Sequence, residues 1–273
     1  MISEFADRIG GVTVKLITMF TLLFLLVPLI IAFALSFTAT GLQFPPRSLS
    51  LVNYVSLFSR QDFKESLVAS LVLATCATAI SLSVGIAASV VLVRRQFKGR
   101  DFLNALFLSP LTLPGIAIGV SMLNLFIMLG IVDSFLKLLI AHSIITLPYV
   151  LRTVSASLIG FDRTLEEASQ NLGANEIETF KRITLPLIKP AILAAIILSF
   201  QVSFNNVTVS VFLTGVFFYT LPVVLLSWTY FSFDPTVLAA SGLIFLSTLI
   251  LVLAIEKVLG IDKLIGGIAT SRA

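Results

Sequence analysis

The chain contains few charged residues for its length. Of its 273 residues, 12% are Asp, Glu, Lys or Arg and 58% are hydrophobic, and the mean hydropathy is +1.07. About a quarter of the residues of a soluble globular domain are charged. Because so few charges cannot cover a water-facing surface, the composition excludes a soluble domain and predicts an integral membrane protein.

Cysteine and histidine are nearly absent. Cys76 is the single cysteine and His142 the single histidine, so neither a disulfide framework nor a Cys/His zinc site can be built. The P-loop pattern G-x-x-x-x-G-K-[ST], which cradles the phosphates of ATP, does not occur. The chain therefore offers no nucleotide site of that kind.

Six apolar segments are long enough to cross a bilayer, whose core of about 30 Å needs roughly 20 apolar residues in a helix. They cover residues 14–37, 66–93, 102–129, 134–151, 190–213 and 235–259. The first contains Ala32, Phe33 and Ala34, which resemble a signal-peptidase site, but its apolar run is longer than that of a signal peptide. We predict that this helix is retained, and that residues 1–273 form one all-α transmembrane domain.

Basic residues indicate which side of the membrane each loop faces. The loops between spans two and three and between spans four and five carry Arg94, Arg95, Lys98, Arg100, Arg152, Arg163, Lys181, Arg182 and Lys189. The opposite side carries Arg47, Arg60, Lys64 and Lys137. Since short cytoplasmic loops are enriched in Lys and Arg, we expect both basic loops and both termini to face the cytoplasm.

The centres of the spans contain no Asp, Glu, Lys or Arg. Ion-coupled carriers usually need such groups, or carbonyl sites in broken helices. Any energy for transport is therefore expected from a partner chain.

Polar side chains gather in the fifth span, where Gln201, Asn205 and Asn206 are the candidates for lining a translocation path. Neutral amides can equally join helices by hydrogen bonds, and both interpretations stay open. His142 and Asn124 are expected to be packing groups with satisfied hydrogen bonds.

Two features interrupt the apolar pattern. Pro110, Pro114 and Pro148 lie inside the third and fourth spans and favour kinks, because each removes a helical hydrogen bond. Residues 221–231 predict a short interfacial or re-entrant helix, and Asp234 followed by Pro235 has the chemistry of a helix start for span six.

Residues 160–189 change to a pattern of short amphipathic helices. Thr164 and Glu167 have the spacing of a capping box, and Gly173 stands where a helix ends. Asn175 and Glu178 predict the cap of a second short helix. We expect Pro186 to end that helix and Pro190 to open the fifth span.

These short helices need a surface to pack against, since helices of two or three turns are marginal in water. The carboxylates of Glu166, Glu167, Glu176 and Glu178 would be repelled by anionic lipid and by DNA. A protein partner is favoured. The alternative is an ordinary solvated loop.

The same segment carries a family resemblance. Its pattern E-A-S-x-x-x-G, nine further residues and I-x-L-P is similar to the E-A-A loop of permease subunits in binding-protein-dependent ABC importers. The matching positions are Glu167, Ala168, Gly173, Ile183, Leu185 and Pro186, and Ser169 stands where the family usually has alanine. The resemblance extends to S-L-x-x-Y at residues 50–54 and F-x-x-S-L at residues 63–67.

This resemblance implies the type I importer fold in a bacterial inner membrane. Two permease subunits would form the path, an external binding protein would deliver the solute, and two cytoplasmic ATPases would bind ATP and Mg²⁺. No cofactor is expected in this chain, which would be a transport subunit rather than an enzyme, with no nucleic-acid partner. Glu167 would contact the ATPase, Ala168 and Leu172 would fill its groove, and Gly173 would permit the turn between the short helices.

The substrate is less constrained. Residues 203–215 followed by T-L-P at 220–222 resemble the polyamine subgroup, which implies a second permease of different sequence. That subgroup tends to have an acidic pair where this chain has Asn205 and Asn206, which would suit a neutral or zwitterionic solute unless the sister subunit supplies the acids. Permeases for ferric iron, aminophosphonates or opines are alternatives. A self-sufficient channel, an ion-coupled carrier and an intramembrane enzyme are alternatives of other classes.

Overall fold

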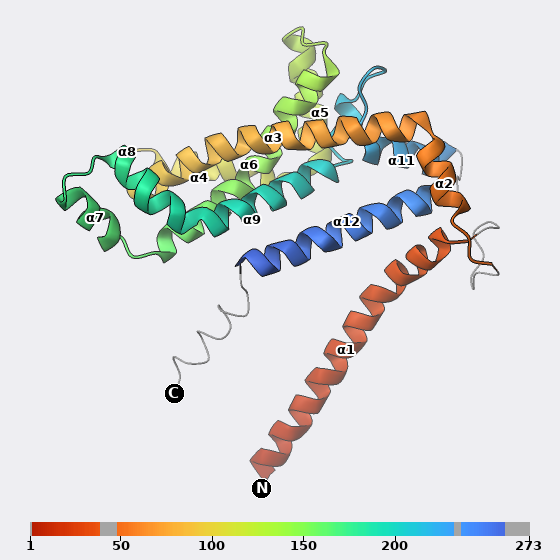
Figure 1. Cartoon of the computed structure of the whole chain (residues 1–273), viewed down its shortest axis with the longest axis horizontal. Helices are drawn as coiled ribbons and strands as arrows, with labels where there is room; N and C mark the ends of the chain where they lie inside the picture. The colour runs from red at the N-terminus through yellow and green to blue at the C-terminus, as the bar shows by residue number, and fades with distance from the viewer. Residues whose placement is uncertain (1, 39–47, 232–235, 260–273) are drawn as a thin grey trace. The chain divides into compact units, whose positions relative to one another are not determined.

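The computed structural model describes residues 2–38, 48–231 and 236–259, with side chains described for residues 13–38, 48–231 and 236–253 (Figure 1). In chain order the helices are α1 (Ile2–Ser36), α2 (Val52–Ser59), α3 (Gln61–Arg94), α4 (Arg100–Leu108), the 3-10 turn η1 (Ser109–Leu111), α5 (Gly115–Met128), α6 (Ser134–Gly160), α7 (Thr164–Asn171), α8 (Glu176–Thr179), the π turn η2 (Phe180–Thr184), α9 (Leu185–Phe204), α10 (Ser210–Leu213), α11 (Leu221–Phe231) and α12 (Thr236–Leu259). Within these ranges no strand forms, and one isolated β-bridge joins Thr38 and Leu49.

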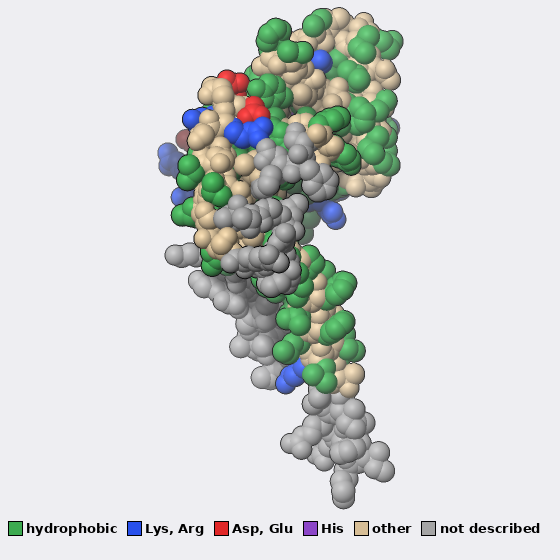
Figure 2. All heavy atoms as spheres, turned by 90° about the vertical axis from the view of Figure 1, so that its right-hand side faces the viewer, with side chains coloured by type: hydrophobic (Ala, Val, Ile, Leu, Met, Phe, Trp, Pro, Cys, Tyr) green, Lys and Arg blue, Asp and Glu red, His purple; other side chains and the backbone are tan. Residues whose placement is uncertain are grey.

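Five described helices are long and apolar enough to cross a membrane, and a bent pair makes a sixth if it is counted as one span. The five are Thr13–Ser36, Gln61–Arg94, Ser134–Gly160, Glu176–Phe204 and Thr236–Leu253, and the bent pair is Arg100–Leu111 with Gly115–Met128. Figure 2 shows hydrophobic side chains over the face of α1 that is in view. The predicted all-α membrane class is confirmed.

The chain forms two compact units. The first comprises Met1–Gln61 and Trp228–Ser247, and the second comprises Asp62–Ser227 and Thr248–Ala273. Within the first unit the Asn53 amide donates hydrogen bonds to the carbonyls of Ser36 and Thr38 at 3.3 and 2.9 Å. These bonds tie α2 to the end of α1, where the carbonyl groups have no helical partner.

The second unit is organised around α3, α6 and α9, which run side by side (Figure 1). A Cβ atom at Gly85 of α3 would lie 2.6 Å from Val150 Cγ1 of α6, so only glycine allows this approach. One apolar cluster consists of Val150, Val154 and Leu158 of α6 with Ile188 and Ala195 of α9, and Leu82, Ile86 and Val90 of α3 pack against it. A second joins α3, α5, α6 and α10 and includes Leu73, Phe126, Leu138, Val209 and Leu213.

The third predicted span is not one straight helix. Its two halves, α4 with η1 and then α5, meet at an angle of 105° near Pro110 and Pro114. Proline removes helical hydrogen bonds, so the bend lies where the sequence favours one. The fifth predicted span is also broken, because α9 ends at Phe204 and α10 begins only at Ser210.

The predicted short helix at residues 221–231 is confirmed as α11 (Leu221–Phe231). The Leu221 N–H donates to the Ser70 hydroxyl of α3 at 2.7 Å, which holds the helix start. Arg47, Asp234, Pro235, Lys263 and Arg272 lie outside the described residues.

Candidate functional site

The helix α7 begins differently from the predicted capping box. Asp162 Oδ1 accepts a hydrogen bond from the Thr164 N–H at 2.9 Å, and the Thr164 side chain does not cap. The predicted capping box is wrong because Arg163, the residue before Thr164, already has helical φ and ψ angles. The Glu167 carboxylate lies 3.6 Å from the Arg163 guanidinium instead. The hydrogen bond from the Thr164 backbone lowers the pKa of Asp162 below its ordinary value, because it favours the carboxylate form.

Gly173 ends α7 as the sequence predicts. Its φ angle is +93°, a left-handed conformation that costs an L-residue roughly 1–2 kcal/mol. The Gly173 N–H donates to the Gln170 carbonyl at 2.9 Å, and the Ala174 N–H donates to the Ser169 carbonyl at 3.2 Å. This pair of bonds is a Schellman motif, which satisfies the last carbonyls of the helix.

The cap of the second short helix is confirmed. Asn175 accepts from the Glu178 N–H at 2.9 Å, and Glu178 accepts from the Asn175 N–H at 3.3 Å. The predictions that Pro186 ends this helix and that Pro190 opens the fifth span are wrong, because α8 continues through η2 into α9, and Pro190 lies inside α9. In the π turn the Leu185 N–H bonds to the Phe180 carbonyl five residues earlier, and this shift lets the helix pass Pro186, which has no N–H.

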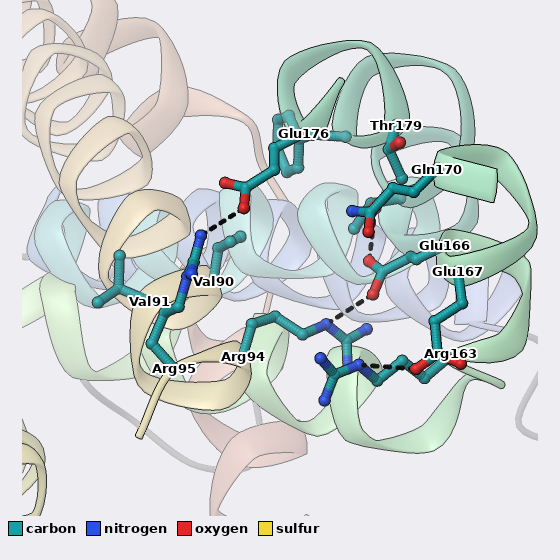
Figure 3. A pocket seen from close by; sticks show the side chains of 12 residues that line it. Val90, Val91, Arg94, Arg95, Arg163, Glu166, Glu167, Gln170, Glu176 and Thr179 are labelled. Carbon is teal, nitrogen blue, oxygen red and sulfur yellow. Dashed lines mark hydrogen bonds and ion pairs between the residues drawn. The ribbon is translucent and has the colours of Figure 1, made fainter. Parts of the chain in front are cut away.

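Glu166 points inward from α7 and joins three elements (Figure 3). Its Oε2 lies 3.0 Å from Arg94 Nε at the end of α3, and its Oε1 accepts from the Thr184 hydroxyl of η2 at 2.6 Å. The side chains of Arg94 and Glu166 are only 16% and 12% exposed. The Arg94 guanidinium also lies 4.7 Å above the Phe161 ring.

A second ion pair joins the same parts of the chain. Arg95, the residue after α3, places its Nη2 2.5 Å from Glu176 Oε1 of α8, but these side chains are 62% and 71% exposed. Figure 3 shows both pairs beside a cleft of about 350 Å³, whose lining includes Arg94, Arg95, Glu166 and Glu176. An exposed pair contributes about 0–1 kcal/mol, so the Arg94–Glu166 pair is the stronger attachment of the short helices to α3.

The outward side of the short helices is apolar and exposed. Leu172 is 90% exposed, Ile177 66% and Leu165 47%. Glu167 and Ala168 are exposed on the same helix α7. Ser169 instead turns toward α8, where its hydroxyl accepts from the Thr179 hydroxyl at 3.3 Å, a bond that the usual alanine cannot make.

The remaining predicted residues of the segment lie apart from this outward side. Ile183 is half-buried in η2, and Leu185 and Pro186 are exposed in the first turn of α9. Because η2 packs against α7, these residues belong to the connection between the short helices and the fifth span.

The three candidate path residues have different environments. The Gln201 amide donates to the Thr248 hydroxyl of α12 at 2.6 Å. Asn206 accepts from the Val209 N–H at 2.9 Å and so caps α10. Asn205 is exposed, and no hydrogen bond joins its side chain to another described residue.

Sequence reasoning did not identify the internal attachments. Arg94 was assigned only to the basic loop, and Glu166 only to a charged face. The available signal was opposite charge: a basic loop at residues 94–100 and an acidic one at residues 166–178, both predicted on the same side of the membrane.

Comparison with known proteins identifies the family. The model of the binding-protein-dependent transport system inner membrane component matches residues 77–260. The Escherichia coli spermidine/putrescine transport system permease protein PotC is 31% identical over 235 residues, which cover 86% of this chain and 89% of that protein. The Escherichia coli putrescine transport system permease protein PotI is 30% identical over 228 residues, which cover 81% of each.

Solved structures have the same fold. A chain of a bacterial ABC transporter involved in the import of the acidic polysaccharide alginate matches with a TM-score of 0.69 and 18% identity, over 93% of this chain and 96% of that one. A chain of the alginate transporter in complex with an alginate pentasaccharide-bound periplasmic protein matches with a TM-score of 0.70 and 16% identity, over 92% and 93%. The chain thus belongs to the binding-protein-dependent transport system inner membrane component family and is the membrane-spanning permease subunit of an ABC importer.

Proposed function

We propose that this permease imports a polyamine or a related small amine. The observation that carries this proposal is its similarity over most of its length to PotC and PotI, whose names state spermidine/putrescine and putrescine transport. A polyamine is an extended cation, so a path without fixed positive charge suits it. The candidate residues Gln201, Asn205 and Asn206 are all uncharged.

The outward side of α7 and α8 is the proposed docking site for a cytoplasmic ATPase. Exposed Leu172, Leu165 and Ile177 would enter its groove, and Glu167 would make a polar contact at the edge. The inner side is attached to α3 by Arg94–Glu166 and to η2 by Thr184. Movement of the short helices would therefore be transmitted to two spans, α3 and α9.

The complete importer on this proposal has two permeases of different sequence, two ATPases that bind ATP and Mg²⁺, and an external binding protein. This chain holds no cofactor. The loops 94–100 and 152–189 are rich in Lys and Arg, which favours the cytoplasmic side of a membrane. The termini and the 160–189 loop would therefore face the cytoplasm. Ile183, Leu185 and Pro186 would transmit movement of α7 into α9.

Asn205 is the proposed contact for the solute. Its side chain is exposed at the break of the fifth span, whereas Gln201 and Asn206 are occupied within the chain. A neutral amide attracts a cation less than a carboxylate does, which fits a path that binds weakly enough to release its solute.

Two measurements test the substrate. The binding protein encoded beside this permease should bind putrescine or spermidine in calorimetry, and should bind ferric iron, an aminophosphonate and an opine far more weakly. Cells lacking other polyamine importers should take up labelled putrescine only when the permease, its partners and this binding protein are present. Tight binding of one of the other solutes, with no binding of polyamines, contradicts the proposed substrate.

A further inference from the structure

The fifth predicted span, residues 190–213, is not one continuous helix. Residues 205–209 join α9 to α10 without continuous helix. Backbone that leaves the helical pattern at membrane depth needs replacement hydrogen bonds, and is found only where protein or a hydrated cavity surrounds it. The contacts that hold this break therefore decide the shape of the path beside it.

His142 of α6 contacts both sides of the break. Its Nδ1 lies 2.8 Å from the Ser203 hydroxyl, in the last turn of α9, and its Nε2 lies 3.0 Å from the Ser210 hydroxyl, at the start of α10. His142 and Ser210 are 0% exposed, and Ser203 is 3% exposed. One imidazole thus spans the interruption from the side of α6.

The hydrogen-bond chain assigns the tautomer of this histidine. The Ser210 hydroxyl donates its one proton to the Asn206 carbonyl at 2.6 Å. It must therefore accept from His142, so Nε2 carries the proton. Nδ1 of the neutral ring is then an acceptor, and Ser203 donates to it. Every member of the chain has a partner, and the unwound carbonyl of Asn206 is satisfied through Ser210.

The break also packs closely against α5. A Cβ atom at Gly115 would lie 3.0 Å from Thr208 Cγ2, and one at Gly119 would lie 2.6 Å from Phe212 Cδ2. Glycines four residues apart allow such an approach between helices. This contact fixes how near α10 lies to α5, but it contains no polar link between α9 and α10.

We propose that His142 is a positioning residue that joins α9 to α10 and thereby holds the break in the shape that presents Asn205. This inference rests on the proposed function only for the role of Asn205 in the path. The link that His142 makes between α9 and α10 depends only on the fold, so it is the same for any transported solute.

The two ring nitrogens can be tested separately. In His142→Asn the side-chain oxygen lies near the position of Nδ1 and accepts from Ser203, but the side chain is too short to reach Ser210. His142→Gln has the length to donate its amide N–H to Ser210 while its amide oxygen accepts from Ser203, so it keeps both contacts. Ser210→Ala removes the far partner of His142 and, with it, the hydrogen bond to the Asn206 carbonyl. The matched control is Ser143→Ala, because that hydroxyl, on the next residue of α6, bonds only to the Leu139 carbonyl of its own helix.

A buried cysteine reports whether the break opens. Val209 is 1% exposed at the end of the interruption, and Leu158 is 0% exposed in the other apolar cluster. In a Cys76→Ser background, Val209→Cys reports the break and Leu158→Cys reports general loosening. A small water-soluble methanethiosulfonate labels the complete importer in native membranes.

We expect labelling at position 209 to rise about fivefold in His142→Asn and Ser210→Ala, the factor that the loss of one interhelical hydrogen bond predicts. His142→Gln and Ser143→Ala should stay near the parent rate, and labelling at position 158 should not change. For uptake, KM should rise in His142→Asn and Ser210→Ala and recover in His142→Gln.

Three results would overturn the inference: unchanged labelling at 209 in His142→Asn and Ser210→Ala, an equal rise in Ser143→Ala, or an equal rise at position 158. If the parent importer takes up no polyamine, the proposed substrate fails, and the labelling at 209 still decides the role of His142. Ser210→Ala removes a single oxygen atom, so it keeps the test available if the histidine variants do not assemble.

Discussion

Arg94 at the C-terminal end of α3 and Glu166 in α7 form a nearly buried ion pair, with 3.0 Å between Nε and Oε2. The pair connects a membrane span to the short helix whose other side is exposed. The Glu166 carboxylate also accepts from Thr184, so the same residue holds α7 to η2 at the entrance of α9. Glu166 thus connects α7 to α3 and, through η2, to α9.

Arg94→Gln should uncouple ATP hydrolysis from uptake. Breaking a fully buried pair costs about 3–5 kcal/mol, and this slightly exposed pair should cost on the order of 2 kcal/mol of α7 docking. We expect uptake to fall several-fold while the ATPase still associates. The measurement is the ratio of ATP hydrolysed to solute imported in proteoliposomes.

The exposed pair supplies the matched control. Arg95→Gln removes an arginine from the neighbouring position, but its pair is open to solvent and should contribute under about 1 kcal/mol. Its coupling ratio should stay close to that of the parent. Equal effects of the two substitutions would show that burial of the Arg94–Glu166 pair is unimportant.

Gly173→Asp should abolish transport and leave membrane insertion intact. The residue has a φ angle of +93° and nothing lies within 4 Å of an added Cβ, so the expected damage is backbone strain plus a new charge beside the docking surface. Asn tolerates left-handed angles about as well as Asp, so Gly173→Asn should retain several-fold more uptake. Uptake and ATPase co-purification are measured together. Normal uptake with normal ATPase association in Gly173→Asp would contradict the role given to this loop.

Gly119→Ala should destabilise the permease. An added Cβ would lie 2.6 Å from Phe212 Cδ2, and overpacking of this kind costs about 1–3 kcal/mol. Gly160→Ala is the control, because nothing lies within 4 Å of its Cβ position. Thermal unfolding in detergent should show a lower midpoint for Gly119→Ala alone. The double variant Gly119→Ala/Phe212→Ala should lose less than the sum of its parts, and strict additivity would exclude this contact as the cause.

Asn205→Asp should strengthen polyamine uptake. The side chain is exposed, so a carboxylate there would face a cationic solute directly. Asn206→Asp should matter less, because its carboxylate can accept from the Val209 N–H as the amide does. Competition between putrescine and an uncharged analogue of putrescine measures how far each substitution changes the preference for a cation. A larger shift for Asn206→Asp than for Asn205→Asp would reverse the assignment of the path residue.

The sequence predicted local chemistry better than long-range contacts. Asn175 and Glu178 form the expected capping box because that motif depends only on residues three apart. Gly173 likewise ends its helix through local backbone preference. The family, the helical class and α11 also followed from local patterns.

The failures have both local and long-range causes. Pro186 does not end its helix because a π turn shifts the hydrogen-bond pattern before it. The Thr164 box is absent because Asp162 already supplies the acceptor. Neither the Arg94–Glu166 pair nor the contact of His142 with Ser203 and Ser210 could be predicted, since each joins residues more than 60 positions apart.

Reconstitution tests the central claim most directly, namely that this chain is the membrane part of an importer driven by a separate ATPase. One set of proteoliposomes contains the two permeases alone, and a second set also contains the ATPase subunits. ATP is supplied on the side of the vesicle membrane that the ATPase subunits face. Labelled solute is supplied with its binding protein. The account predicts uptake only when the ATPase and hydrolysable ATP are both present. Sustained uptake by the permeases without ATPase or ATP would contradict it and indicate a channel or an ion-coupled carrier.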